Sequence, residues 1–143
     1  MPSVEQQPVI LLAEDDELTA AAWSAVLRLH GFEVVWADGA SAWALARASR
    51  PDLLLTDWNM PGIDGPELCR IFRDDPILEC VPIILASSLS PTPSTTPMLH
   101  DLFLEKPAEA TALLAAISGF IVVTGAIDDP RGDADSADGY PKV

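Results

Sequence analysis

Short apolar runs recur along the chain, and stretches with the residue spacing of helices lie between them. The first run, VILLA at Val9–Ala13, has no polar residue, which is typical of a strand buried on both faces of a parallel sheet. Further strands are predicted at Glu33–Ala37, Leu53–Thr56, Val81–Ala86 and Leu102–Leu104, and helices at Leu18–Leu29, Asp38–Ser49, Pro66–Arg73 and Ala108–Val123. Strands that alternate with helices predict an α/β fold: a doubly wound, five-stranded parallel sheet with helices on both faces.

Two segments depart from this alternation. The stretch SSLSPTPSTTP at Ser87–Pro97 holds three prolines between the fourth and fifth predicted strands. One proline inside a helix costs about 3 kcal/mol, so we expect a loop here rather than a helix. The last residues, 125–143, are rich in Asp, Gly and Pro and are expected to be disordered. The sequence thus predicts an N-terminal extension at 1–8, one folded domain at 9–124 and an acidic tail at 125–143.

The composition excludes several classes of protein. The net charge is −14, from 22 acidic and 8 basic residues, and the basic residues are scattered, which disfavours direct binding of nucleic acid. The longest apolar stretch, Ala112–Val123, is shorter than the roughly 20 residues of a membrane span. Met1–Pro8 has no basic residue, so it does not read as a signal peptide, and we expect a cytoplasmic protein. Cys69 and Cys80 have no zinc-binding spacing, and no disulfide is expected.

Polar side chains follow four of the predicted strands. Glu14 and Asp15 follow the first strand, Asp57 the third, Ser87 the fourth and Lys106 the fifth. The carboxyl ends of parallel strands meet at one edge of a sheet, so these side chains should lie together. Crowded carboxylates without His or Cys favour Mg²⁺. A lysine and Mg²⁺ can neutralise charge while a phosphoryl group moves onto an aspartate, and a serine hydroxyl can bond the new phosphoryl oxygens.

The order of these motifs carries a resemblance to a known family. An acidic pair, then TDWNMPGIDG, PIILAS and LEKP, resembles the receiver domain of bacterial response regulators, the flavodoxin-like CheY superfamily of two-component signalling, over about Val9–Val123. The resemblance implies that Asp57 accepts phosphate from a sensor histidine kinase. It also implies that Glu14 and Asp15 are the acidic pair and that Mg²⁺ binds there, with Asp57 and the backbone carbonyl of Asn59.

Further roles follow from the same resemblance. Ser87 and Lys106 match the switch hydroxyl and the lysine of the site, and Phe103 matches an aromatic residue that swings inward after phosphorylation. Gly65 matches the loop that shapes the site. The family's fourth helix, however, should lie between Ser87 and Lys106, where this chain is rich in proline. Most receivers present their phosphorylation-dependent surface there, so the usual output route is in doubt.

The last predicted helix is unusual because no charged residue occurs after Glu109 as far as Val123. A helix that is apolar all round is normally buried all round. We therefore predict a homodimer or partner interface formed by Leu113, Ile117, Phe120 and Ile121.

The favoured interpretation is a single-domain response regulator that signals by protein–protein interaction or phosphorelay. It would not be an enzyme beyond its own phosphoryl transfer and autodephosphorylation. One alternative is a phosphorylation-independent interaction module that keeps the acidic site as a relic. Another, a Mg²⁺-dependent phosphohydrolase, would need an acid where Asn59 stands. Trp58 is interpreted either as a shield of the site or as a partly exposed aromatic residue, and Trp23, Trp36 and Trp43 as packing residues.

Overall fold

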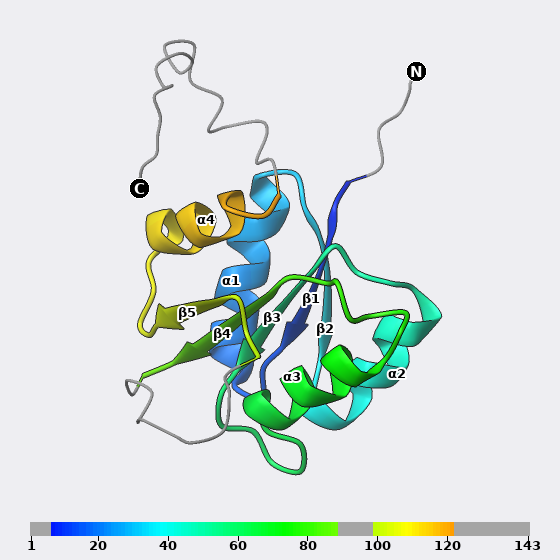
Figure 1. The fold of residues 1–143 in the computed structure, drawn as a ribbon. Helices are drawn as coiled ribbons and strands as arrows, with labels where there is room; N and C mark the ends of the chain where they lie inside the picture. The colour runs from blue at the N-terminus through cyan, green and yellow to red at the C-terminus, as the bar shows by residue number, and fades with distance from the viewer. Residues whose placement is uncertain (1–6, 89–98, 122–143) are drawn as a thin grey trace, which may run out of the picture.

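The computed structural model describes residues 7–88 and 99–121 of the chain (Figure 1). Strands and helices alternate through most of it, as the sequence predicts. The strands are β1 (Val9–Ala13), β2 (Glu33–Ala37), β3 (Leu53–Asp57), β4 (Ile83–Ser87) and β5 (Leu102–Glu105), and the helices are α1 (Glu17–Leu29), α2 (Gly39–Ala48), α3 (Gly65–Asp74) and α4 (Ala110–Ser118). None of the helices within the described ranges is long and apolar enough to cross a membrane.

The five strands form one sheet in the order β2-β1-β3-β4-β5, and every neighbouring pair is parallel. The predicted α/β class and five-stranded parallel sheet are therefore confirmed. Helices α1 and α4 cover one face, and α2 and α3 cover the other (Figure 1). Because all five strands are parallel, their carboxyl ends lie at one edge of the sheet, which the helices on the two faces leave open.

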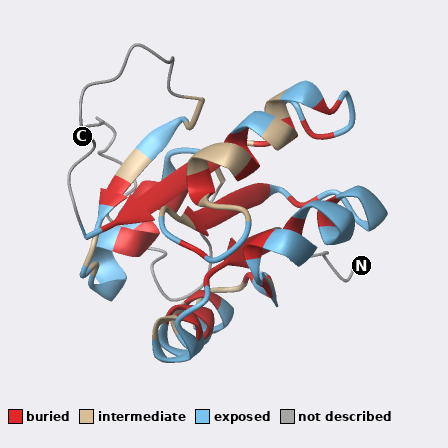
Figure 2. Cartoon of the chain, turned by 90° about the horizontal axis from the view of Figure 1, so that it is seen from below, coloured by how far each residue is buried: buried red, intermediate tan, exposed pale blue. Residues whose placement is uncertain are grey.

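Successive residues of the inner strands supply the two halves of the core. Leu53 and Leu55 belong to the cluster under α1 and α4, whereas Leu54 between them belongs to the cluster under α2 and α3. All three side chains are fully buried, and each contributes roughly 1.5–3 kcal/mol of transfer free energy. This double burial explains why β1 is apolar throughout and why β3 begins with three leucines. Figure 2 shows the sheet buried between helices whose outer faces are exposed.

Aspartates begin three of the four described helices. Asp16, Asp38 and Asp64 are the N-cap residues of α1, α2 and α3, and each side chain accepts a hydrogen bond from a backbone N–H three residues on. Such a cap stabilises a helix by about 0.5–2 kcal/mol. Some of the acidic residues near the strand ends therefore serve to begin the following helices.

The fourth strand was predicted at Val81–Ala86, but β4 begins two residues later, at Ile83, and ends one residue later, at Ser87. Pro82 has no N–H to donate, and the Val81 N–H closes a turn onto the Leu78 carbonyl at 3.0 Å, so the strand begins at Ile83. Its last residue is Ser87, which fixes the candidate switch hydroxyl on the sheet rather than in the following loop.

The last helix is shorter than predicted, and the predicted interface is wrong for two of its residues. α4 ends at Ser118 with Gly119 as C-cap, and residues 122 and 123 lie outside the described part. Leu113 and Ile117 are 0% exposed in the core of their own chain, so they cannot meet a partner. The exposed positions of α4 hold only small residues: Ala110, Thr111, Ala112, Ala115 and Ser118. Because these residues carry no charge, the sequence pattern wrongly indicated that this face is buried as well. Phe120, 39% exposed, and half-buried Ile121 stay candidates.

The segment between β4 and β5 is described only at its two ends. Ser88 and Leu99–Asp101 form no helix. The proline-rich residues 89–98 lie outside the described residues, as do residues 1–6 of the predicted extension (1–8) and the predicted tail (125–143). Arg73 of α3 anchors the chain as it returns to β5. Its guanidinium donates to the carbonyls of Leu99, Glu79 and Val81 and to Asp101 Oδ2, at 2.7–3.0 Å. Side-chain contacts to α3 thus hold the start of β5 in place.

Candidate functional site

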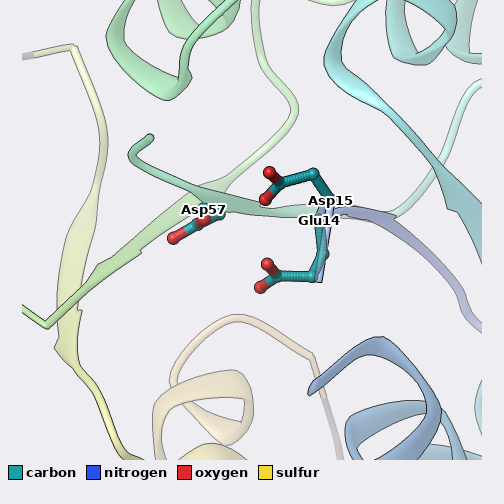
Figure 3. Close-up of side chains that lie close together, drawn as sticks. All are labelled: Glu14, Asp15 and Asp57. Atoms are coloured by element: carbon teal, nitrogen blue, oxygen red, sulfur yellow. The ribbon is translucent and has the colours of Figure 1, made fainter. Parts of the chain in front are cut away.

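Three carboxylates meet at the carboxyl edge of the sheet. Ala13 and Thr56 pair in the register of β1 and β3, so Glu14 and Asp57, the next residues, lie beside each other. One carboxylate oxygen from each of Glu14, Asp15 and Asp57 lies within 4.8 Å of the others. Figure 3 shows Glu14 and Asp15 leaving the end of β1 on the side where Asp57 lies. The structure therefore brings together the acids that the sequence predicts.

Glu14 is the buried member of this group and is held at both its backbone and its side chain. It is 1% exposed; Lys106 Nζ donates to Oε1 at 3.0 Å, and the Asp16 N–H donates to Oε2 at 3.2 Å. The Trp36 indole N–H donates to the Glu14 carbonyl at 2.7 Å. Burial raises the pKa of Glu14 and the charge of Asp57 adds to it, although the bonds from Lys106 and Asp16 act against the rise. Asp15, in contrast, is exposed and open to a ligand.

Lys106 joins β5 to the acids. Its backbone N–H donates to the Ser87 carbonyl at 2.8 Å, which fixes where the side chain starts. Nζ then lies 3.0 Å from Glu14 Oε1 and 3.2 Å from Asp57 Oδ1. Burial by itself would lower the pKa of Lys106, but the hydrogen bond and charge of Glu14, followed by those of Asp57, outweigh burial and raise it. The ammonium group is therefore held in its charged form beside the candidate phosphoacceptor.

The two predicted switch residues lie on neighbouring strands. Ser87, 3% exposed, ends β4 one residue beyond Ala86, the register partner of Asp57. Phe103 lies half-buried on β5 with its ring edge-on to Trp58, at a centroid distance of 6.4 Å and an interplanar angle of 77°. Trp58 is thus a half-buried contact of Phe103 directly after Asp57, the candidate phosphoacceptor. The switching roles of Ser87 and Phe103 stay predictions.

The loop from β3 to α3 closes tightly behind Asp57. Gly62 has a φ of +81°, a conformation that favours glycine, and the Gly65 N–H donates to the Trp58 carbonyl at 2.8 Å. A Cβ on Gly65 would collide with the Asp57 carbonyl and the Leu85 side chain. The match of Gly65 to the family's loop therefore has a steric cause. Asn59 lies exposed in the same loop, and the role of its backbone carbonyl as a Mg²⁺ ligand stays a prediction.

The donor set fits a hard divalent cation. The candidate ligands are carboxylate oxygens, and no His or Cys belongs to the cluster found among the described residues. Oxygen ligands select Mg²⁺ or Ca²⁺ over zinc, and the small number of protein carboxylates suits Mg²⁺, which keeps several waters. Exposed Asp15 and half-buried Asp57 are the members best placed to bind such an ion, while both oxygens of Glu14 already accept hydrogen bonds.

An open cleft of about 590 Å³ borders the acids on the side of Asp15. Its wall includes Glu17, Trp36, Asp38, Leu45 and Pro61. The prediction that Trp36 and Trp43 are packing residues is wrong in this respect: Trp36 is 47% exposed and bonds the Glu14 carbonyl, and Trp43 is 41% exposed and bonds Asp75 at 2.9 Å. Apolar spacing alone could not reveal either hydrogen bond, because both join residues far apart in the sequence.

Comparisons with known proteins agree with this geometry. Residues 10–118 match the family model described as the response regulator receiver domain. The chain is 32% identical over 142 residues to the transcriptional regulatory protein CseB of Streptomyces avermitilis, covering 94% of this chain and 59% of the relative. It is 32% identical over 126 residues to the response regulator PleD of Caulobacter vibrioides, covering 85% of this chain and 28% of the relative. The chain thus spans less than two thirds of the length of either relative.

Solved structures give the same result. The chemotaxis protein CheY4 of Vibrio cholerae superposes with a TM-score of 0.72 at 25% identity, covering 81% of this chain and 100% of that one. The receiver domain of a sensor histidine kinase from Pseudomonas aeruginosa superposes with a TM-score of 0.73 at 27% identity, covering 80% and 98%. That receiver domain has a magnesium ion coordinated in its active site cleft.

Proposed function

Because this chain belongs to the response regulator receiver domain family, we propose that it accepts a phosphoryl group on Asp57 in a Mg²⁺-dependent reaction. The observation that carries the proposal is the contact of Lys106 with Asp57 inside a group of three carboxylates whose oxygens lie within 4.8 Å. Such crowding is unfavourable without cations, and a phosphoryl transfer site needs cations. Lys106 supplies one of them, and the acids can bind another.

The chain's own residues account for the chemical step. One Asp57 carboxylate oxygen forms a P–O bond while the P–N bond of a phosphohistidine breaks, and the imidazole leaves with the electron pair. Lys106 stabilises negative charge on the transferring group, and Glu14 keeps Lys106 in place. Bound Mg²⁺ would offset the remaining charge on the phosphoryl oxygens. The Ser87 hydroxyl would then donate to the phosphorylated product.

The donor and the output follow from the same chemistry. A sensor histidine kinase or a phosphotransfer protein would supply the phosphohistidine, in the cytoplasm. The output would be a contact with another protein or onward transfer in a relay, without turnover of a separate substrate. The match between acids, hydroxyl and lysine favours this function over a phosphorylation-independent interaction module, because a relic site need not keep Lys106 bonded to both Glu14 and Asp57.

Mass spectrometry after incubation with acetyl phosphate and Mg²⁺ tests the proposal. Wild type should gain the mass of one phosphoryl group, and Asp57→Asn should gain none. Asp74→Asn, a change at an aspartate on α3 with a side chain 74% exposed, is the matched control and should behave as wild type. No gain in wild type, or an equal gain in Asp57→Asn, would contradict the proposal.

Metal binding can be tested without the phosphoryl transfer. Mg²⁺ at ten times its dissociation constant should stabilise wild type by about 1.4 kcal/mol in thermal or urea unfolding. Asp15→Asn and Asp57→Asn should lose most of this stabilisation, while Asp74→Asn keeps it. Equal stabilisation of all four proteins would place the ion elsewhere.

A further inference from the structure

The ammonium group of Lys106 has a third neighbour besides the two carboxylates. Lys106 Nζ lies over the indole ring of Trp23, 5.6 Å from the ring centroid, which is within the range of a cation–π contact. We propose that Trp23 is a positioning residue for phosphoryl transfer, which holds the Lys106 ammonium at the phosphoacceptor. The inference rests on the proposed function and assigns a role in it to a residue of α1.

Helix α1 delivers Trp23 to this place rigidly. Asp16 caps the helix, its Oδ2 accepting the Thr19 N–H at 2.9 Å, directly after the acids of β1. Trp23 follows seven residues later, which is about two helical turns, so it lies on the same face as the cap. The ring is only 6% exposed and belongs to the core cluster with Leu27, one turn further on. A side chain packed in this way cannot follow Lys106 if the lysine moves, so it defines a fixed position for Nζ.

The ring has a use that the carboxylates cannot fulfil. Lysine is flexible, and Lys106 Nζ contacts both Glu14 and the residue that would be modified. When Asp57 gains a phosphoryl group, its negative charge grows, and the pull on Nζ changes. Trp23 keeps the same charge and place before and after the step. Preorganised groups of this kind favour the transition state because they need not reorganise during the reaction.

Nuclear magnetic resonance can detect the contact directly. The sequence has two lysines, Lys106 and Lys142, so Lys142→Arg leaves Lys106 as a single, unambiguous signal. In that background the Lys106 ε-methylene protons should be shifted upfield by the ring current of Trp23 in the folded protein. Trp23→Leu should abolish the shift. Leu27→Ala, a core change on the same helix face without this contact, should leave it in place.

Kinetics test the positioning role. Cation–π contacts alter a rate by about threefold at exposed sites and by up to about thirtyfold in desolvated ones. Lys106 is 17% exposed, so Trp23→Leu should slow phosphorylation by acetyl phosphate about tenfold at saturating Mg²⁺. The Mg²⁺ dissociation constant should not change, because the candidate metal ligands are untouched. Trp23→Phe keeps an aromatic face and should recover part of the rate, while Leu27→Ala should lower stability but not the rate of the folded fraction.

A double-mutant cycle separates positioning from packing. If Trp23 acts through Lys106, Trp23→Leu should have little further effect on the rate in a Lys106→Met background. An undiminished effect there, or an ε-methylene signal that Trp23→Leu does not move, would overturn the inference. Failure of the proposed function can be distinguished from failure of this inference, because wild type would then gain no phosphoryl group. The Trp23–Lys106 contact could still be tested by the ring-current shift and by the same double-mutant cycle applied to free energies of unfolding.

Discussion

Replacing Arg73 by alanine should destabilise the protein by removing the anchor of β5. The guanidinium donates to the carbonyls of Leu99 and Val81 in partly buried surroundings, at 3.0 and 2.8 Å. Its contacts with the Glu79 carbonyl and with Asp101 are exposed, and water can replace them at small cost. Loss of a charged hydrogen-bond donor should cost about 1–1.5 kcal/mol for each of the two partly buried carbonyls. The free energy of unfolding should therefore fall by about 2–3 kcal/mol.

The same helix offers a matched control. Within the described residues, Arg70 is exposed and its ion pairs are with Glu67 and Asp74 of the same helix, so Arg70→Ala should cost about 0.5 kcal/mol or less. Urea unfolding followed by circular dichroism measures both variants. Because Arg73 holds the residues that lead into β5, amide exchange in Arg73→Ala should accelerate more in β5 than in β1. Equal losses in the two variants, or uniform acceleration across the sheet, would refute the idea that Arg73 anchors this strand.

Three further predictions concern single positions. Gly65→Ala should lower both stability and the phosphorylation rate, measured by urea unfolding and mass spectrometry, because its Cβ would collide with the backbone at the end of β3; an unchanged rate would contradict this. The hydrogen bond from Trp43, with smaller contributions from the Ile77 N–H and Arg47, lowers the pKa of Asp75 below 3.8. The charged Asp75 carboxylate therefore stabilises the fold fully above pH 3.8, and this stabilisation is lost as the pH falls through the folded pKa. The free energies of unfolding of Asp75→Asn and wild type should therefore converge in acid. A difference that stays constant with pH would argue against the Trp43–Asp75 hydrogen bond. Burial raises the pKa of Cys69 to about 12, so a thiol reagent at pH 8 should label exposed Cys80 alone until the protein unfolds, and rapid labelling of both would show the site to be open.

Much of the candidate site could be predicted because it depends on strand ends. An apolar run buried on both faces can be recognised from composition, and parallel strands place their carboxyl ends at one edge whatever the helices do. The positions of Glu14, Asp57 and Lys106 followed from these two facts, and the contacts of Lys106 with both acids agree with them. Helix initiation was similarly local, because an aspartate cap bonds a backbone N–H only three residues away.

The wrong predictions concern residues whose burial depends on how the elements pack together. Leu113 and Ile117 were assigned to an interface because the last helix lacks charges, yet they fill the core and alanines face outward. Alanine is tolerated in both places, so the hydrophobic pattern could not distinguish a buried face from an exposed one. Trp36 was likewise assigned to packing, although its indole N–H bonds the Glu14 carbonyl.

The sequence by itself determined the α/β alternation and the set of residues at the carboxyl edge, since both depend on short-range pattern and on the geometry of parallel strands. Only the tertiary structure decided what surrounds those residues. Trp23 lies beside Lys106, and Arg73 beside Leu99, through contacts between elements that are far apart along the chain. Periodicity describes which face of an element is apolar, but which element packs against that face depends on the whole fold. That packing is what places the Trp23 ring beside Lys106.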